Sequence, residues 1–347
     1  MFHSDDYHVH AVGWSALGRR GGDPVVRSRD LDRAATVAAA GLAGSLGAAD
    51  LFKRAIGQGR ESWMTTCSWD MWGAQLRTGC ESWRYVSTRA VPEALDLRRT
   101  LLGGVGAIGS AFIYLADLGV MTGDLLLLDR DTVDATNLNR SPLFTVLDAL
   151  DAVPKTAAGQ LYLSGRGVNV IRRDGTWREH AEAIGVQPFD AWISLTNEDG
   201  AWAELPFQLP PVVLHATTTS GWGFGAGRHI PRVEDCTLCR MPRPATEFRG
   251  PCAEGQIDEV RPEIRASLPF LSTAAASLLL AIYMQLSAVT EAPQLANDIS
   301  ADLGVGLRAV IALHRGATQG CRGCRAVASR AWTTRGGRGV FSDWSCG

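Results

Sequence analysis

Two cysteine pairs, Cys236/Cys239 and Cys321/Cys324, carry the clearest signal for metal chemistry in the chain. Each pair has the Cys-x-x-Cys spacing, and four thiolates suit the tetrahedral coordination of zinc. The two pairs lie too far apart in the sequence to form an independent finger, so the zinc would join two distant parts of one domain. Four thiolates leave no coordination position open to a substrate. We therefore predict a structural zinc site.

A cluster of glycines at residues 103–109, G-G-V-G-A-I-G, carries the first signal for a nucleotide site. Gly104, Gly106 and Gly109 fit the Gly-x-Gly-x-x-Gly pattern, whose turn brings the backbone and a helix N-terminus close to phosphate. A strand-like run precedes the cluster and a helix-like run follows it. Asp129 ends the next strand, where it can accept a hydrogen bond from a ribose hydroxyl. The pattern predicts nucleotide binding and, taken alone, favours NAD.

The stretch around and after this aspartate, residues 125–144, changes that assignment. Its sequence is L-L-L-L-D-R-D-T-V-D-A-T-N-L-N-R-S-P-L-F. It closely resembles the ThiF/MoeB/HesA family, the adenylating superfamily that includes ubiquitin-activating enzymes. The family pattern is an Asp-x-Asp-x-Val stretch, then Asn-Leu-x-Arg, then a lysine further along. The positions that carry the resemblance here are Asp129, Asp131, Asn137, Arg140 and Lys155.

The resemblance implies an ATP-dependent adenylation. In that reaction a C-terminal carboxylate joins the α-phosphate of ATP and pyrophosphate leaves, so cations must neutralise the charge that builds on the phosphates. Arg140 and Lys155 would supply those cations, and Asn137 would offer its amide to a phosphate oxygen or to the attacking carboxylate. Asp129 would hold the ribose, while Asp131 and the three glycines would complete the ATP site.

One departure from the family pattern concerns magnesium. After the strand that ends at Leu195 the family has Thr-Asp-Asn, whose aspartate is linked to magnesium and ATP. This chain has Thr196, Asn197, Glu198 and Asp199 there. Magnesium prefers charged oxygen ligands, so either Glu198 or Asp199 takes over the role or metal binding is altered. We expect an active site that uses ATP and Mg²⁺, with Asn197 and Glu198 beside the nucleotide.

An acceptor for the activated acyl group is the next question. Cys252 lies in F-R-G-P-C-A-E-G, and a similar element follows the first Cys-x-x-Cys pair in ThiF and MoeB relatives. In part of that family such a cysteine receives the acyl group, and a thiolate is a good nucleophile towards an acyl adenylate. The alternatives are a structural Cys252 or a hydroxyl acceptor in the Thr-Thr-Thr-Ser run at residues 217–220.

Alternating strand and helix patterns from Arg99 onward predict βαβ units and a mostly parallel sheet, whose ligands bind at the carboxyl ends of the strands. The expected helices are 34–56, 107–118, 151–163 and 266–286, and the expected strands are 124–128, 168–172, 190–195 and 211–215. The predicted fold is therefore α/β: a Rossmann-like adenylation domain with a structural zinc site, plus a smaller helical N-terminal region.

Two parts of the chain are expected from these patterns. Residues 1–95 would form an N-terminal accessory region, in one interpretation a shortened, inactive adenylation-like layer, because the small-residue helices at 34–56 and 266–286 have a similar texture. Residues 96–347 would form the ATP-binding adenylation domain with its four-cysteine zinc site. We see no separate catalytic-cysteine domain and no ubiquitin-fold domain.

Composition excludes several classes of protein. The 347 residues hold 34 basic and 36 acidic side chains, a formal net charge of -2, which argues against a general nucleic-acid binder. The apolar fraction of 46% excludes a disordered or collagen-like chain. Residues 268–286 are as long as a membrane span, but their alanines and serines suit a buried helix better. We predict a soluble, cytoplasmic protein that binds no membrane.

These observations lead to a first choice of function and several alternatives. The first choice is adenylation of the C-terminal glycine of a ubiquitin-like protein in a bacterial conjugation pathway, with transfer to an enzyme nucleophile. Its partners would be that carrier, a conjugating enzyme and a second copy of the chain. Sulfur-carrier activation comes second. Peptide modification of the microcin type comes third, with the N-terminal region clamping a leader peptide.

Two rivals come from other classes. A non-catalytic scaffold is favoured by Asn197 alone. A plain NAD dehydrogenase leaves Asn137, Arg140 and the zinc cysteines unexplained.

Overall fold

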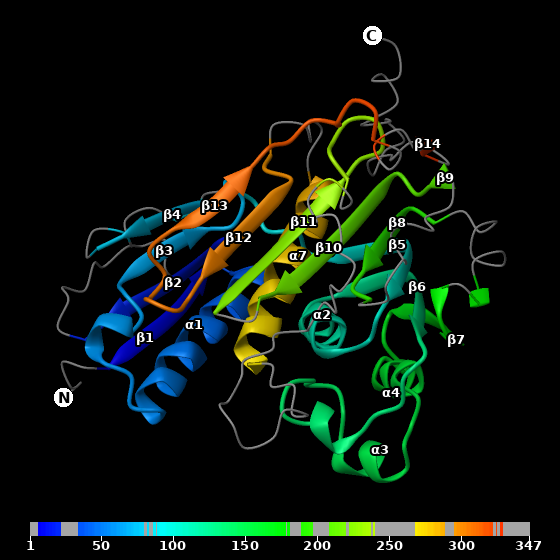
Figure 1. Ribbon diagram of the computed structural model, residues 1–347, viewed down its shortest axis with the longest axis horizontal. Coiled ribbons are helices and arrows are strands. Elements are labelled where there is room, and N and C mark those ends of the chain that lie inside the picture. The colour runs from blue at the N-terminus through cyan, green and yellow to red at the C-terminus, as the bar shows by residue number, and fades with distance from the viewer. Residues whose placement is uncertain are drawn as a thin grey trace.

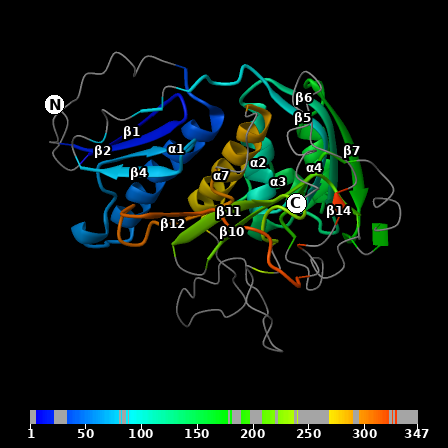
Figure 2. The ribbon, with the colours of Figure 1, turned by 90° about the horizontal axis from the view of Figure 1, so that it is seen from above.

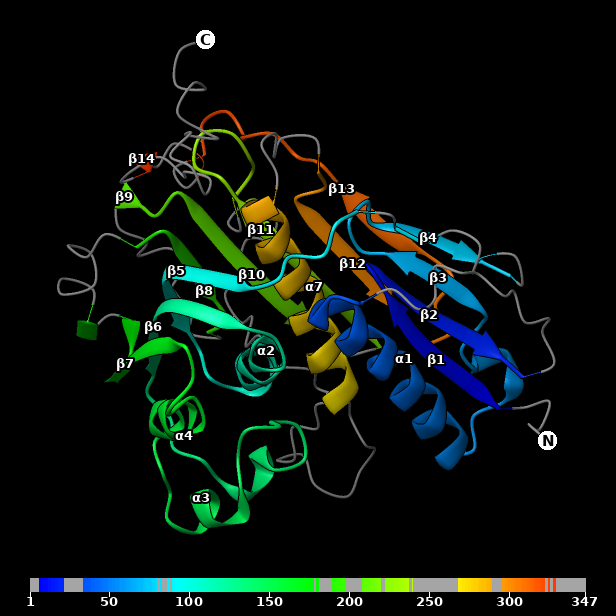
Figure 3. The same ribbon diagram turned by 180° about the vertical axis from the view of Figure 1, so that it is seen from behind.

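The computed structural model describes residues 6–21, 34–79, 82, 86–87, 89–177, 179–180, 189–196, 208–219, 222–236, 239, 268–288, 295–321, 324 and 327–328. An eight-stranded sheet runs through this part of the chain, with helices packed on one of its faces (Figure 1). Seen from behind, α1, α7 and α2 lie in front of the sheet (Figure 3). The strands end in loops along the edges of the sheet, and the candidate functional site lies at one of these edges.

Five of the eight strands of the large sheet run parallel to one another, as the alternating pattern predicts. Its strand order is β13-β12-β11-β10-β8-β5-β6-β7, and the strands from β10 to β7 are all parallel to one another. The parallel strands are β5 (Leu95–Gly103), β6 (Met121–Asp129), β7 (Val168–Asp174), β8 (Ala191–Ser194) and β10 (Val212–Thr218). The antiparallel strands are β11 (Gly223–His229), β12 (Asp298–Asp302) and β13 (Val310–Leu313). Two short strands, β9 (Gln208–Leu209) and β14 (Val327–Ala328), pair separately.

Helices α2 (Ala107–Asp117) and α4 (Lys155–Tyr162) pack on the parallel strands and follow them in the βαβ order. The short helices η4 (Ala135–Asn137) and α3 (Val146–Leu150) lie between β6 and α4 in the sequence and contact each other. The expected helix at 151–163 begins only at Lys155, because Pro154 lacks an N–H and cannot lie inside a helix. Pro154 instead serves as the residue before the first turn.

Helix α7 (Pro269–Ala288) packs at the centre of the molecule between α1, α2 and the sheet. It is long and apolar enough to cross a bilayer, yet 89% of its most apolar window is buried inside the protein. Its Tyr283 hydroxyl donates to the carbonyl of Leu97 at 2.8 Å and lies 2.9 Å from the hydroxyl of Thr100. This burial and these contacts with β5 are those of a core helix, as the sequence predicts.

The N-terminal region is not only helical, and this corrects the sequence prediction. The expected helix is present as α1 (Val37–Ala55), capped by Thr36, whose hydroxyl accepts from the N–H of Ala39 at 3.0 Å. A four-stranded antiparallel sheet packs beside it, in the order β1 (Tyr7–Val12), β2 (Ser15–Arg20), β3 (Cys67–Asp70) and β4 (Gln75–Thr78), with the short helix η2 (Arg60–Ser62) preceding β3. These strands are only four to six residues long, which is too short to give a clear alternating pattern.

The N-terminal region packs against the rest of the described chain, with α1 beside α7 (Figure 2). Aromatic contacts also join it to the large sheet. Trp69 on β3 lies 6.0 Å from Phe224 on β11, measured between ring centroids. Phe52 on α1 packs at 6.0 Å from Trp222 and 5.7 Å from Phe270. These side chains belong to one continuous core, so the described parts of the two regions share their buried surface.

A buried lysine also joins the two regions. The Lys53 side chain on α1 is fully buried, and its ammonium donates to the carbonyls of Ser62, Leu303 and Gly304 and lies 4.8 Å from the ring centre of Trp222. Burial disfavours the charged form and lowers the pKa of Lys53 from 10.5 to about 8.

We predict that Lys53 makes folding stability rise with pH. Because its folded pKa of about 8 lies below the unfolded value of 10.5, the unfolded chain binds more protons between those values, and raising the pH favours the folded state. From pH 8 to 9.5 the Lys53 contribution to the free energy of unfolding should grow by about 1–2 kcal/mol. Urea titration of the wild type and of Lys53→Met at both pH values measures it, since the variant lacks the group. An equal pH response in both proteins would contradict the prediction.

Candidate functional site

Five parallel strands, β5, β6, β7, β8 and β10, end at one edge of the sheet, which we call the carboxyl edge. Gly103, Asp129, Asp174, Ser194 and Thr218 are the last residues of those strands. In open α/β sheets, ligands bind at this edge. The predicted nucleotide residues therefore lie where such a fold presents its binding site.

The glycine turn after β5 has the geometry that its sequence predicts. Gly104 has a φ of +94°, and a Cβ there would lie 2.8 Å from the carbonyl carbon of Leu195. A Cβ on Gly109 would overlap the carbonyl oxygen of Gly104, so α2 can approach the turn only with glycine at that position. Gly106 precedes the first turn of α2, and none of the described atoms lies within 4 Å of where its Cβ would be. Space is thus open in front of a helix N-terminus whose first N–H groups lack intrahelical partners.

Asp129 lies between the glycine turn and the family motif. Its carboxylate accepts from the N–H of Val105 at 2.6 Å and from the N–H of Asp131 at 2.9 Å. Burial raises its pKa above the ordinary value, although these two hydrogen bonds and the nearby charge of Lys155 oppose the rise. The carboxylate is therefore held in a fixed orientation at the end of β6, where it can accept a further hydrogen bond.

Lys155 is a nearly buried cation at the start of α4. It is 8% exposed, its ammonium lies 2.9 Å from a carboxylate oxygen of Asp131, and its backbone N–H donates to the Asp131 carbonyl at 3.0 Å. The Asp131 side chain is 54% exposed, so the ion pair opens towards solvent at the carboxyl edge. A buried lysine beside an exposed carboxylate can transfer its contact to an anionic ligand.

Asn137 ends the short helix η4 and is 6% exposed. Its side-chain oxygen accepts from the N–H of Asp134 at 3.1 Å, which leaves its NH₂ group to donate to a ligand. Hydrogen bonds from the Thr136 hydroxyl and N–H, together with the charges of Lys155 and Arg140, hold the pKa of Asp134 below its usual range. Arg140 and Lys155 are therefore both close enough to Asp134 for their charges to act on its carboxylate.

The structure thus brings most of the predicted ATP-site residues to one place. They are Gly104, Gly106, Gly109, Asp129, Asp131, Asn137, Arg140 and Lys155. Asn197, Glu198 and Cys252 lie outside the described residues, so the magnesium and acceptor assignments stay predictions.

Sequence reasoning missed two hydroxyl residues at the same edge. Ser194 ends β8 and Thr196 follows it, and the hydroxyl oxygen of each is buried without a hydrogen-bond partner in the described part of the chain. No sequence signal marks these two hydroxyls, because the lack of a hydrogen-bond partner is a property of the folded surroundings.

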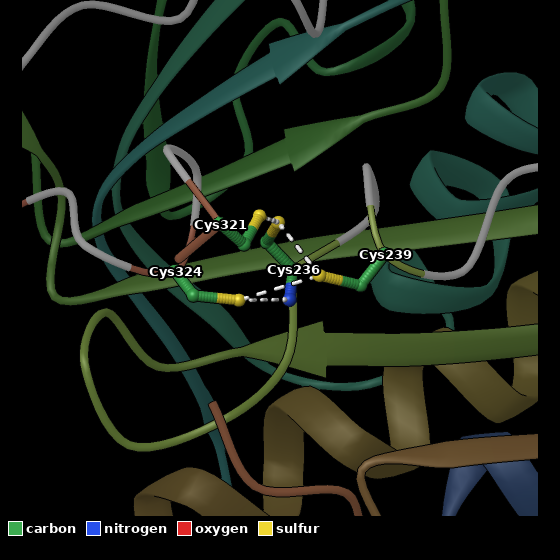
Figure 4. A group of neighbouring side chains, drawn as sticks. All are labelled: Cys236, Cys239, Cys321 and Cys324. Atoms are coloured by element: carbon green, nitrogen blue, oxygen red, sulfur yellow. Dashed lines mark hydrogen bonds between the residues drawn. The ribbon is translucent and has the colours of Figure 1, made fainter. Parts of the chain in front are cut away.

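The four predicted zinc ligands form one cluster (Figure 4). The sulfur atoms of Cys236, Cys239, Cys321 and Cys324 all lie within 4.8 Å of one another. The separation is 3.5 Å for Cys236–Cys321 and for Cys239–Cys324, and 3.8 Å for Cys236–Cys239. These separations are too long for disulfides, and they match the edge of about 3.8 Å that Zn–S bonds of about 2.3 Å give a tetrahedron. The donor set and its geometry therefore fit zinc.

A buried ion pair supports the loop that carries the first cysteine pair. Arg228 and Glu234 are both fully buried, with two guanidinium nitrogens 2.9 and 2.7 Å from one carboxylate oxygen. The other carboxylate oxygen accepts from the N–H of Ile230 at 3.1 Å. Beyond this loop, the N–H of Cys236 donates to the sulfur of Cys324 at 3.3 Å. The loop is thus fixed to β11 before it reaches the cluster.

One comparison with a solved structure shows a shared fold. The structure of the microcin C7 biosynthetic enzyme MccB in complex with N-formylated MccA has a TM-score of 0.51 and 14% identity, and the match covers 92% of this chain and 97% of that chain. Escherichia coli MccB with ATP gives a TM-score of 0.48 at 14% identity, over 92% of this chain and 97% of that one. Escherichia coli MccB with MccA-N7isoASN gives 0.49 at 16% identity, over 65% and 67% of the two chains.

Comparison by sequence places the central part of the chain. No curated protein sequence matches this chain. A family model described as the ThiF family matches residues 85–191, the stretch that contains the glycine turn, Asp129 and Lys155. The region that holds the candidate nucleotide residues is thus similar to the ThiF family.

Proposed function

We propose that the protein uses ATP to adenylate the C-terminal carboxylate of a peptide, releasing pyrophosphate. The observation that carries the proposal is the meeting of the glycine turn, Asp129 and Lys155 at the carboxyl edge of a ThiF-family domain. A carboxylate oxygen of the peptide attacks the α-phosphorus of ATP, the bond to the pyrophosphate oxygen breaks, and acyl-AMP forms.

We assign each described residue a role in this reaction from its position. The N-terminus of α2 faces the phosphates, and Asp129 accepts a hydrogen bond from the ribose. Lys155 exchanges its contact with Asp131 for the phosphate charge that grows as pyrophosphate leaves, and Arg140 adds a second positive charge. The NH₂ group of Asn137 donates to a phosphate or carboxylate oxygen.

A peptide substrate has more support than the ubiquitin-like carrier ranked first by the sequence. The MccB structure that shares this fold over 92% of the chain is a complex with N-formylated MccA, and that match includes the N-terminal region. We propose that this region, with its four-stranded sheet and α1, holds the part of the peptide remote from the reacting carboxylate. A glycine-ending carrier, a conjugating enzyme, a homodimer and a cytoplasmic location stay predictions from the resemblance, as does the boundary near residue 95.

Two metals complete the proposal. Mg²⁺ would accompany ATP, with Glu198 or Asp199 as its carboxylate, because Asn197 offers no charge. Zinc would be held by the four clustered cysteines and would supply a cross-link, since four thiolates leave no position open for chemistry. Burial raises the pKa of Cys236, so a bound cation is needed to favour its thiolate form.

The direct test of the proposed function is pyrophosphate exchange into ATP. Peptides encoded by the short reading frames beside the gene would be synthesised with a free C-terminal carboxylate and, as a matched control, with a C-terminal amide. We expect exchange that requires the free acid, because an amide cannot attack the α-phosphorus to form acyl-AMP. Equal exchange with acid and amide, or ATP cleavage only at the γ-phosphate, would contradict adenylation.

The variant Lys155→Gln should slow the exchange by about 10²–10³-fold, since it removes a cation placed where transition-state charge develops. Its folding cost is expected to be below about 1 kcal/mol, because the lost ion pair is partly exposed. Arg166→Gln is the control: it removes a half-exposed cation that pairs with Asp117 away from the carboxyl edge. If Lys155→Gln exchanges pyrophosphate at the same rate as Arg166→Gln, Lys155 has no part in the mechanism.

The zinc proposal predicts one zinc per chain in the purified protein, measured by mass spectrometry of the metal content. Cys239→Ser should lose most of the zinc and lower the melting temperature by at least about 5 °C, because metal binding contributes folding free energy. Cys67→Ala removes a buried cysteine on β3, outside the cluster, and should keep its zinc. Full zinc occupancy in Cys239→Ser would show that the cluster is not the binding site.

A further inference from the structure

A change from apolar to polar residues occurs at the carboxyl edge, on the sheet face turned away from α2 and α7. One row of neighbouring residues across β6, β5, β8 and β10 on this face is Leu126, Leu101, Trp192 and Val213. All four are buried in a single apolar cluster, in which Trp192 stacks on Trp177 with 4.5 Å between ring centres. This inner row is an ordinary core.

The next row towards the carboxyl edge is Leu128, Gly103, Ser194 and His215. A strand side chain two residues further along lies on the same face, so this row continues the apolar one and is the last on this face before β5, β6 and β8 end. A glycine, a hydroxyl and an imidazole replace the large apolar side chains there. The row therefore places polar side chains, Ser194 and His215, on the next two strands beyond Gly103.

The hydroxyl groups at this place are the unusual feature. Ser194 is 3% exposed, yet its hydroxyl has no hydrogen-bond partner among the residues that the structure describes. The Thr196 hydroxyl is also buried and has no hydrogen-bond partner among the described residues. The methyl carbon of Thr196 lies 3.6 Å from where a Cβ of Gly103 would be. Leaving a buried hydroxyl unsatisfied costs roughly 1–3 kcal/mol. Two of them side by side point to a ligand that supplies the missing partners.

The strand order indicates which reacting group would lie beside these two hydroxyls. The ribose carboxylate, Asp129, is on β6, and the phosphate-binding turn follows β5. Ser194 is on β8, the neighbour of β5 on the side away from β6. If ATP binds in this way, the adenosine lies on the β6 side, and the β8 side of the α-phosphate is left to the peptide carboxylate.

We propose that Ser194 and Thr196 form an acyl subsite, in which their hydroxyls donate to the carbonyl or carboxylate oxygen of the C-terminal residue being adenylated. This inference rests on the proposed function. His215, next to Ser194 in the parallel register between β8 and β10, borders the subsite. The ligand it takes is the acyl half of an acyl adenylate.

The test compares two nucleotide probes that differ in the acyl half. One is AMP and the other is 5′-O-(N-glycylsulfamoyl)adenosine, a stable mimic of glycyl-AMP. Their dissociation constants would be measured by calorimetry for the wild type, Ser194→Ala and Thr196→Val. Each substitution should weaken the glycyl mimic by roughly tenfold, as expected for a lost buried hydrogen bond, and leave AMP unchanged.

Thermal melting of the unliganded proteins separates binding from a structural role. Removing an unpartnered buried hydroxyl should leave the melting temperature of Ser194→Ala unchanged or higher, while the affinity for the glycyl mimic falls. Ser277→Ala is the matched control, since its buried hydroxyl already donates to the Thr273 carbonyl at 2.8 Å and lies on α7. That variant should bind both probes as the wild type does.

The possible outcomes distinguish the two proposals. If the wild type binds neither probe, the nucleotide site itself is wrong. If the wild type binds both, and Ser194→Ala and Thr196→Val bind both equally well, the acyl subsite is overturned while the proposed function stands. Equal loss of AMP and of the glycyl mimic would assign the hydroxyls to the nucleotide and also overturn the subsite.

Discussion

The close contact of three backbone segments at the carboxyl edge is the constraint on which the rest of the structure depends. A side chain on Gly104 would meet the carbonyl carbon of Leu195, and one on Gly109 would overlap the carbonyl oxygen of Gly104. Glycine at both positions lets the turn after β5, the first turn of α2 and the end of β8 come together. The proposed ribose and phosphate groups lie on one side of this contact, and the proposed acyl group lies on the other.

Polar anchors fix the remaining elements around that contact. Lys53 ties α1 to the loop after β12 through backbone carbonyls, and the Arg228–Glu234 pair ties the first cysteine loop to β11. Both anchors attach to the antiparallel half of the sheet and are fully buried. Buried charges of this kind tolerate few alternative arrangements, because the loss of a partner leaves a charge buried without compensation. These contacts hold the antiparallel strands in place, and the parallel strands carry the proposed ligand-binding edge.

Sequence patterns predicted the parallel half well and the N-terminal region poorly, for physical reasons. The apolar run before Asp129 and the glycine turn fix a strand, a tight turn and a helix locally, so β6 and α2 fall close to their expected bounds. The four short N-terminal strands depend on packing against α1, which their own sequences do not encode. The partnerless hydroxyl of Ser194 could not be found either, because satisfaction of a hydroxyl is a property of the folded surroundings.

Hydrogen–deuterium exchange of the full chain with ATP or NAD tests the central claim, that the carboxyl edge is an ATP site, most directly. The account predicts that magnesium ATP slows exchange of the backbone amides around Gly104–Gly109, at Asp129–Asp131 and at the start of α4, while β1 to β4 are unaffected and NAD has no effect. Slowed exchange with NAD, or unchanged exchange at the carboxyl edge with saturating ATP, would contradict it.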